Sequence, residues 1–501
     1  MSKTIKISNK FKSASAMLNI KNINLPARSS VFFTLTNLIC KGFAFLFTPI
    51  FTRLLSPADY GEFSLFSTFL SLSAVAVTME ISGGIIMRLF QKERELQFLS
   101  ILCAWLISIA AAIPTTIFLW LIQKSTGFGM NFPFAYVMLF FSLISISIIN
   151  LYVSRCKFRY SWAPPLITAL AQSVLAPIVS IAVLRISYLS NANHVSLKIS
   201  AVTAVLSTVA LCIAILTVAR AKEELRAQDK SSLNALSFFC ASSRFLLKLA
   251  LPLLPYYLSI IALSQADKLF ISSFMGRGEL AKYSVAYSAG VALTALTSGV
   301  MGALSPWIMR RTRAGEYERI RQVLSRITSA SVPIIVIFLC FAPDLFSFLA
   351  PKEYGSALPV LFISAMIPIP LALAQCSSSI AIAKERVGGV LFSGIFPAIM
   401  TLALNFLTIN RAPLHVPAII TAVGFITLAA LGIANIRKIT GYCTVNVNKT
   451  FQNLLFLITL STTVYSFKEF IFIRASIVTF SFLVLTLMIK PTLSLLKETH
   501  T

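Results

Sequence analysis

The most constraining feature of the sequence is a series of fourteen apolar stretches, each about as long as a helix that crosses a membrane. About 20 helical residues span the roughly 30 Å of hydrocarbon in a bilayer. Lipid offers no hydrogen bonds to the backbone, so such stretches must be helical. The sequence therefore predicts an all-α polytopic membrane protein with spans at residues 31–54, 63–87, 98–122, 134–154, 163–184, 199–219, 245–275, 283–309, 327–350, 357–383, 390–409, 417–436, 451–467 and 470–489.

The composition excludes a soluble enzyme. Apolar residues make up 57% of the 501 positions and charged residues only 12%, whereas soluble domains contain about 25% charged residues. A chain this apolar cannot cover its surface with polar groups, so lipid is the better solvent. The 43 Lys and Arg against 17 Asp and Glu give a net charge of +26. By itself, this surplus would suggest a nucleic acid or an anionic lipid surface as the partner.

The distribution of the basic residues predicts the topology. If the N-terminus is cytoplasmic, Lys and Arg on that side outnumber those on the opposite side by about three to one, as the positive-inside rule requires. Both termini are then cytoplasmic, and residues 1–30 form a basic tail without an apolar segment typical of a cleavable signal. Because the topology explains the basic surplus, no nucleic-acid partner is expected.

No cofactor, metal site or catalytic machinery is expected. The three histidines, His194, His415 and His500, lack the spacing of metal ligands. The sequence contains no GxxxxGK[ST] motif for binding nucleotide phosphates. All eight cysteines fall in spans or in predicted cytoplasmic loops, so no disulfide is predicted. The predicted outer loops are too short to hold an extracellular catalytic domain.

An internal repeat divides the chain. Residues 54–64 align with residues 274–284 at an offset of 220. Each copy contains a long apolar helix, a tight outer turn with an acidic residue, an aromatic residue followed by Ser, and a second long helix. Six spans separate equivalent positions, which predicts parallel repeats about an axis along the membrane normal. The predicted domains are a basic tail (1–30), an N-terminal six-helix lobe (31–219), a cytoplasmic linker (220–244), a C-terminal six-helix lobe (245–440), and an extra helix pair with a cytoplasmic tail (441–501).

Two segments resemble a known family. The sequence LLSPADYGEFSLF at residues 54–66, and LPLLPYYLSIIALSQADKLFISSFMG at residues 251–276 followed by GELAKYSVAYS, resemble bacterial O-antigen and polysaccharide flippases of the Wzx type. These flippases belong to the multidrug/oligosaccharidyl-lipid/polysaccharide exporter superfamily. The likeness extends over residues 30–440. That family typically has twelve spans, whereas the lipid II flippases of the same superfamily have fourteen.

The resemblance implies a two-lobed transporter in the bacterial inner membrane. Its expected cargo is a polyprenyl-diphosphate-linked oligosaccharide, such as an O-antigen, capsule or exopolysaccharide repeat unit. The transporter would move this lipid from the cytoplasmic to the periplasmic leaflet by alternating access. A polysaccharide polymerase and a chain-length regulator are the protein partners that the resemblance suggests.

A phosphorylated head group needs fixed cations at mid-depth, because an unpaired anion is strongly disfavoured in a low-dielectric slab. Lys41 lies about 15 Å into the first span and Glu80 about 10 Å from the inner end of the second, at 1.5 Å per residue. They form either a structural ion pair or a site where a diphosphate replaces Glu80. Asp267 and Lys268 lie about 10 to 12 Å below the outer end of span seven. Adjacent helical positions point about 100° apart, so we expect one of these two residues to face the cleft.

Other candidates lie at span ends and at prolines. Arg53 and Arg88 either contact phosphates or set orientation at the interface. Pro252 and Pro255 remove backbone donors from span seven, which makes it the best gate candidate, with Pro49 as a rough counterpart in span one. Four amides within spans can bind sugar hydroxyls or make interhelical hydrogen bonds: Gln172, Gln265, Gln375 and Asn405.

Two rival functions stay open. A drug or organic-cation antiporter of the same fold would need acidic residues in the cleft. Lys41 and Lys268 argue against this function, whereas Glu80 and Asp267 keep it open. A membrane-embedded polysaccharide polymerase or glycosyltransferase would need a sizeable outer loop or a cytoplasmic catalytic domain, and neither is evident in the sequence.

Overall fold

The computed structural model describes residues 25–498, apart from residues 84, 94, 127–128, 131, 133, 160, 162, 187–193, 228–234, 385 and 387. Within these residues every regular element is a helix. This confirms the predicted all-α fold class. Most of the predicted basic tail lies outside the described residues.

The first lobe contains the helices that precede the long linker. Its elements are α2 (Leu25–Leu54), α3 (Pro57–Thr78), the 3-10 helix η2 (Ile81–Gly83), α4 (Ile85–Lys92), α5 (Gln97–Thr126), α6 (Ala135–Phe158), α7 (Ala163–Leu170), the π-helical turn η3 (Ala171–Leu175), α8 (Ala176–Ile186) and α9 (His194–Ala227). α9 packs along α5, α6 and α8.

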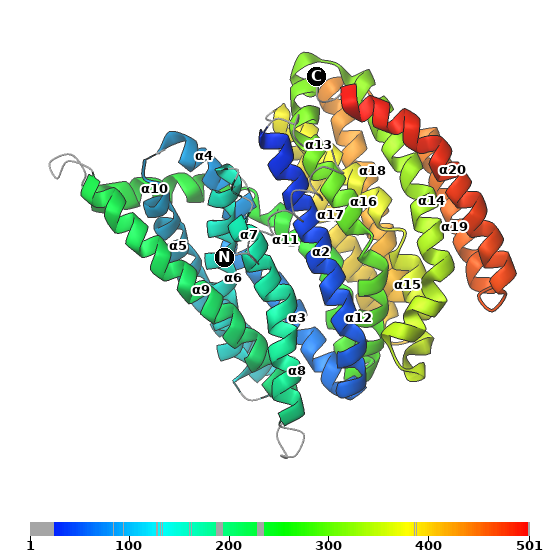
Figure 1. Ribbon diagram of the computed structural model, residues 1–501, viewed down its shortest axis with the longest axis horizontal. Coiled ribbons are helices and arrows are strands. Elements are labelled where there is room, and N and C mark those ends of the chain that lie inside the picture. The colour runs from blue at the N-terminus through cyan, green and yellow to red at the C-terminus, as the bar shows by residue number, and fades with distance from the viewer. Residues whose placement is uncertain are drawn as a thin grey trace, which may run out of the picture.

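The second lobe and the C-terminal pair follow the linker helix α10 (Ala235–Ala250). Their elements are α11 (Leu254–Phe274), α12 (Arg277–Val291), α13 (Thr294–Ala314), α14 (Tyr317–Leu349), η5 (Lys352–Ala357), α15 (Leu358–Ser364), α16 (Pro368–Ala383), α17 (Gly388–Thr408), α18 (Val416–Thr440), α19 (Val447–Ser466) and α20 (Ile471–Glu498). α19 and α20 pack on α14, along the edge of the second lobe that faces away from the first (Figure 1).

All fourteen predicted spans fall on helices, but they differ in membrane-spanning character. Within the described residues, eight helices are long and apolar enough to cross a membrane, and three bent pairs bring the number to eleven. The other three predicted spans are α2, α19 and α20. Among the described residues of these three helices, two shorter stretches are apolar: Phe45–Leu54 of α2 and Ile471–Thr486 of α20.

The second predicted span is not a continuous helix. α3 ends at Thr78, and the next two residues, Met79 and Glu80, both have left-handed backbone conformations, with φ of 47° and 50°. Such values are uncommon for residues other than Gly, Asn and Asp. The helical path resumes at η2 and α4. Glu80 therefore lies in a helix break, not on the regular helix from which its depth was predicted.

The helix of predicted span seven is interrupted near its two prolines. α10 and α11 meet at an angle of 54° across residues 251–253, a segment that contains Pro252. Pro255 lies in the first turn of α11, where its missing N–H is tolerated. α10 does not continue into the second lobe but packs against α4 and α5 of the first. In contrast, α2 continues through Pro49 without interruption.

The two lobes meet along α2 and α3. α3 packs on both α11 and α12 of the second lobe. α2 contacts α13 and α14 on one side and α7, η3 and α8 on the other, and Figure 1 shows it in dark blue between the two halves. Any relative motion of the lobes must therefore involve these two helices.

Candidate functional site

The outer end of the lobe interface is defined here as the end that carries the α2–α3 and α11–α12 turns. At the first turn, the Ser56 hydroxyl accepts a hydrogen bond from the Asp59 N–H and caps α3, and Pro57 begins the helix. At the second turn, Gly276 precedes α12 with φ of 94°, a conformation that glycine adopts readily. These two turns start α3 and α12 at the same end of the molecule, where the helices pack together.

Equivalent residues of the two repeats meet at this end. The Ser64 hydroxyl donates a hydrogen bond to the Ser284 hydroxyl at 2.5 Å, and both side chains are buried. The two residues are 220 positions apart, which is the repeat offset. The repeats therefore face each other here across the lobe interface.

A charged contact closes the same end, and we call it the Arg277 latch. Arg277 Nε of the second lobe lies 2.7 Å from Glu62 Oε2 of the first. Arg277 Nη2 also donates to the carbonyl oxygen of Gly129, in the segment between α5 and α6. Gly61 allows this approach, because a Cβ there would lie 1.9 Å from the Arg277 carbonyl oxygen. The latch thus joins one second-lobe side chain to two segments of the first lobe.

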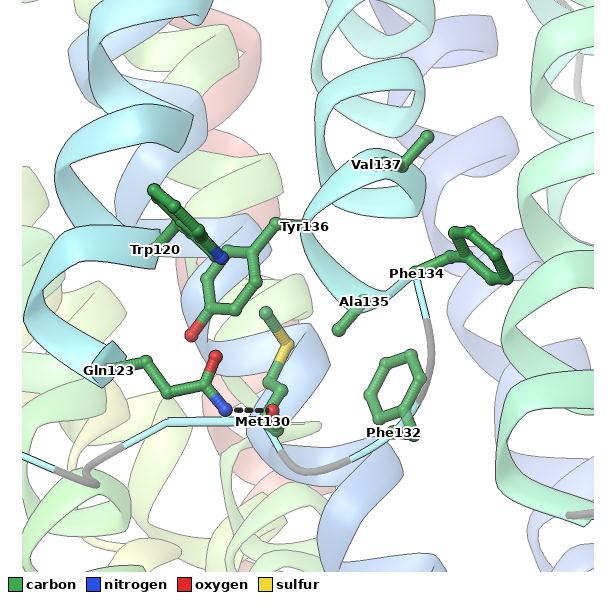
Figure 2. Close-up of a pocket in the computed structure, with 8 residues that line it drawn as sticks. All are labelled: Trp120, Gln123, Met130, Phe132, Phe134, Ala135, Tyr136 and Val137. Carbon is green, nitrogen blue, oxygen red and sulfur yellow. Dashed lines mark hydrogen bonds between the residues drawn. The ribbon is translucent and has the colours of Figure 1, made fainter.

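A cavity of about 500 Å³ lies beside the latch, and we call it the outer pocket. It is lined by Trp120, Gln123, Met130, Phe132, Phe134, Ala135, Tyr136 and Val137. Figure 2 shows the Trp120 and Tyr136 rings on one side and the Gln123 amide donating to the Met130 carbonyl, at 2.6 Å. The pocket adjoins the latch because Gly129 lies against the Tyr136 hydroxyl, which is within electrostatic range of Glu62 and Arg277.

A second cavity, of about 180 Å³, lies in the opposite, inner half of the first lobe, and we call it the inner pocket. It lies between α2, α6, α7 and η3, and its lining is Thr36, Ile149, Asn150, Val153, Lys157, Pro165, Thr168, Ala169 and Gln172. Gln172 belongs to the π-helical turn η3, and π-turns of this kind are frequent at functional sites. The pocket combines one cation with two amides and two hydroxyl groups.

Glu80 faces the second lobe across the interface. Its carboxyl group lies within electrostatic range of the Tyr257 hydroxyl, in the first turn of α11. The helix breaks at Glu80 and at Pro252 therefore bring an acidic residue of one lobe near an aromatic residue of the other. The predicted approach of Lys41 to Glu80 stays a prediction, because the Lys41 side chain lies outside the described part of the structure. The same holds for the predicted role of Arg88, whose side chain also lies outside it.

Asp267 and Lys268 are both buried within the second lobe. The Asp267 carboxylate accepts hydrogen bonds from the Tyr283 hydroxyl and, at 3.3 Å, from the Thr421 hydroxyl. Lys268 Nζ donates to Gln265 at 2.9 Å and lies 5.2 Å from the Tyr287 ring centroid. The two charges thus contact tyrosines one turn apart on α12. Their side-chain partners come from α11, α12 and α18 of their own lobe.

The other predicted cation has a local contact. Arg53 is exposed, and its guanidinium donates to the Pro49 carbonyl at 2.9 Å on the same helix. Sequence reasoning placed Arg277, Lys157 and Lys198 only among the topology-setting charges. Arg277 and Glu62 both lie close to the repeated turn, which is the one signal that could have paired them.

Lys198 has an unusual environment at the outer part of the first lobe. It is only 2% exposed, and its ammonium group lies 3.8 Å from the Phe51 ring centroid, 5.0 Å from that of Tyr60 and 3.5 Å from that of Phe63. Such ring faces attract a cation. Because the rings come from α2 and α3, the cluster fixes these helices to α9.

The fold is shared with solved membrane transporters. The structure titled lipid II flippase MurJ in an inward closed conformation has a TM-score of 0.64 and 13% identity, and covers 92% of this chain and 99% of its own. An outward-facing multidrug resistance MATE family transporter of the MOP superfamily has a TM-score of 0.58 and 14% identity, with coverage of 84% and 97%. An inward-facing multidrug resistance MATE family transporter of the MOP superfamily has a TM-score of 0.55 and 15% identity, and the match covers 81% of this chain and 98% of that structure.

Sequence comparison identifies the family. No curated protein sequence gives a significant match to this chain. The family model described as polysaccharide biosynthesis protein matches residues 27–312, which include the whole first lobe, the linker, α11, α12 and nearly all of α13. This match agrees with the resemblance to a polysaccharide family that the two sequence segments indicated, and the solved structures show that the fold is shared. The chain therefore belongs to the polysaccharide biosynthesis protein family.

Proposed function

We propose that the protein is a flippase that moves a polyprenyl-diphosphate-linked oligosaccharide from the inner to the outer leaflet of the bacterial cytoplasmic membrane. The observation that carries this proposal is the contrast between the closed outer end of the lobe interface and the inner half of the first lobe. The outer end is closed by the Arg277 latch and by Ser64 and Ser284, whereas a polar pocket containing Lys157 lies in the inner half. This arrangement suits a transporter that receives an anionic head group from the inner side.

The chemistry of the cargo explains why such a pocket is needed. The polyprenyl tail can remain in lipid, but the diphosphate must keep polar partners throughout its passage. Lys157 can supply positive charge, and Asn150 and Gln172 can donate hydrogen bonds to phosphate or sugar oxygens. Lys41 and Arg88 are further proposed contacts, since a diphosphate needs fixed cations along its path.

Alternating access requires parts of the interface to move. We propose that the breaks at Glu80 and Pro252 act as hinges of the inner gate, because they interrupt helices on both sides of the interface. We further propose that Asp267 and Lys268 hold α11, α12 and α18 together as one moving unit. Their dense polar contacts within the second lobe support this role.

A flipping assay tests the function. The full-length protein would be reconstituted into vesicles with a polyprenyl-diphosphate oligosaccharide, and a membrane-impermeant glycosidase would report the fraction exposed outside. We expect protein-dependent exposure of the inner-leaflet pool. A Ser64→Cys/Ser284→Cys protein, inactive when oxidised and active when reduced, is the matched control. Correctly folded protein that exposes no additional lipid would exclude the flippase function.

The same vesicles discriminate the main rival. An antiporter of this fold would move an organic cation against a proton or sodium gradient, with Glu80 as the binding carboxylate. We expect that a proton or sodium gradient drives no uptake of ethidium. We also expect lipid to be flipped down its own concentration gradient at the same rate when no ion gradient is present. Uptake of ethidium that depends on Glu80, without lipid flipping, would favour the antiporter.

The proposed orientation places both termini in the cytoplasm. Reporter fusions after Lys124 and Arg313 test it, because these residues end α5 and α13 on opposite sides. A periplasmic signal at Lys124 and a cytoplasmic signal at Arg313 are expected.

We also propose a polysaccharide polymerase and a chain-length regulator as partners, since a repeat unit delivered to the outer leaflet must be polymerised there.

A further inference from the structure

We infer that the outer end contains an exit site for the cargo, in which Arg277 exchanges Glu62 for a phosphate of the head group and the outer pocket receives the adjoining sugar. The inference rests on the proposed function and adds a second binding site to it. The inner pocket would load the cargo, and this site would receive it before release.

Arg277 does not use all of its hydrogen-bonding capacity in the latch. Its guanidinium uses Nε for Glu62 and Nη2 for Gly129. The remaining nitrogen, Nη1, is buried and has no hydrogen-bond partner among the described residues. Buried polar groups without partners are rare and call for an explanation. An oxyanion that reaches this nitrogen would satisfy it.

Opening of the outer end would separate Arg277 from its partners in the first lobe. Glu62 and Gly129 belong to the first lobe, whereas Arg277 belongs to the second. Separation of the lobes at the outer end must therefore break both contacts at once. Because an unpaired charge in such surroundings is strongly disfavoured, opening is favoured when another anion replaces Glu62. A phosphate matches the guanidinium fork as well as a carboxylate does.

The outer pocket beside the latch has the size and lining of a sugar-binding site. Its volume of about 500 Å³ lies within the usual range of small-molecule sites. Trp120 and Tyr136 offer flat aromatic faces, and Gln123 offers an amide, which are suitable partners for a sugar ring and its hydroxyl groups. The Tyr136 hydroxyl is buried beside Gly129, which links the pocket to the latch.

A pair of substitutions separates an exit site from a simple latch. If Arg277 acted only as a latch, Glu62→Gln and Arg277→Gln would change the flipping rate in the same direction, with a somewhat larger effect for Arg277→Gln because it also loses the contact with Gly129. If Arg277 also binds phosphate, Glu62→Gln keeps activity because the guanidinium remains, whereas Arg277→Gln lowers the flipping rate about ten-fold or more. Glu279→Gln, which removes another acidic residue near the same turn, is the control. Changes in the same direction in the Glu62 and Arg277 variants would overturn the inference.

A binding measurement makes the test independent of flipping. The Ser64→Cys/Ser284→Cys protein in nanodiscs would be oxidised with and without undecaprenyl diphosphate, and the rate of disulfide formation would be followed. We expect the diphosphate to slow cross-linking, neutral undecaprenol to leave the rate unchanged, and Arg277→Gln to abolish the effect. The single variants Ser64→Cys and Ser284→Cys control for reactions of the other thiols.

The sugar part of the site has its own comparison. The glycosylated diphosphate should slow cross-linking at lower concentration than the bare diphosphate, and Trp120→Ala should remove this difference. Equal responses to both lipids would overturn the role of the outer pocket. Unchanged cross-linking with every diphosphate lipid, in a protein that flips its cargo, would overturn the exit site and leave the proposed function standing. Absence of flipping despite a diphosphate effect would instead overturn the proposed function.

Discussion

Ser64 and Ser284 occupy equivalent positions of the two internal repeats, and their hydroxyl oxygens are joined by a 2.5 Å hydrogen bond. The local two-fold relation between the repeats therefore passes close to this contact. A motion that separates the lobes at the outer end must break it. The pair is accordingly a direct reporter of whether the outer end is closed.

Gly61→Ala should push the outer end open. A Cβ at this position would lie 1.9 Å from the Arg277 carbonyl oxygen, so α3 and α12 must separate. We expect slower disulfide formation in a Ser64→Cys/Ser284→Cys background. Gly278→Ala is the matched control, because its Cβ meets no atom within 4 Å and it lies in the same region. Cross-linking that is as fast in the Gly61 variant as in the control would contradict the tight approach.

The helical segments and the repeat could be predicted from sequence because both are local properties. Apolar runs of membrane-spanning length mark helices wherever they pack. The repeat offset of 220 pairs Ser64 with Ser284 in the sequence, and the same two side chains are in contact in the fold. The bend at Pro252 could also be predicted from sequence, because proline removes a backbone donor in any surroundings.

Other features depend on tertiary packing and leave little trace in the sequence. Met79 and Glu80 adopt left-handed conformations without being glycine, and the Gly83–Gly84 pair that follows them is interpreted from the sequence as a site of close helix packing. Residues 245–250 form part of an apolar run, yet they pack on the first lobe as the end of α10. Arg277 and Glu62 belong to different lobes, and only the docking of these lobes shows that they pair.

Lys157→Gln should weaken loading of the cargo from the inner side. Lys157 is the only cation lining the inner pocket among the described residues, and hydrogen bonds to charged groups contribute about 1.5 to 3 kcal/mol. Because Lys157 is exposed, we expect the lower limit, or about a ten-fold rise in the lipid concentration for half-maximal flipping. Lys438→Gln, at an exposed position on the inner end of α18, is the control. Equal effects of the two substitutions would rule out a special role for Lys157.

Leu246→Ala should loosen α10 from the first lobe. Leu246 is fully buried in a cluster with Leu89, Phe90 and Ile101. Buried Leu to Ala substitutions cost about 2 to 5 kcal/mol. We expect faster proteolysis within α10, with little change at α14. Lys248→Ala, an exposed substitution on the same helix, should leave proteolysis unchanged. If both variants are cleaved at the wild-type rate, α10 is not held by this contact.

Asp267→Ala should destabilise the second lobe. The substitution leaves the Tyr283 hydroxyl, in a fully buried side chain, without its carboxylate acceptor. A buried donor without a partner costs about 1 to 3 kcal/mol. Asp267→Asn should lose less, because its carbonyl oxygen can still accept. The fraction of protein that stays soluble after heating in detergent ranks the stabilities of these variants. The exposed substitution Ser273→Ala is the control. Equal losses in the Ala and Asn variants would show that charge, and not the acceptor, matters.

Arg474→Gln should free the start of α20 from α14. Arg474 is 8% exposed, donates to the Cys340 carbonyl at 3.0 Å, and pairs with Asp344 at 2.7 Å. Lysine cannot reproduce this forked contact, so Arg474→Lys should rescue only in part. Hydrogen–deuterium exchange should rise in the first turns of α20 and stay constant in α11, and Lys449→Gln on α19 should change neither. Wild-type exchange in the Gln variant would mean that apolar packing alone holds the C-terminal pair on the second lobe.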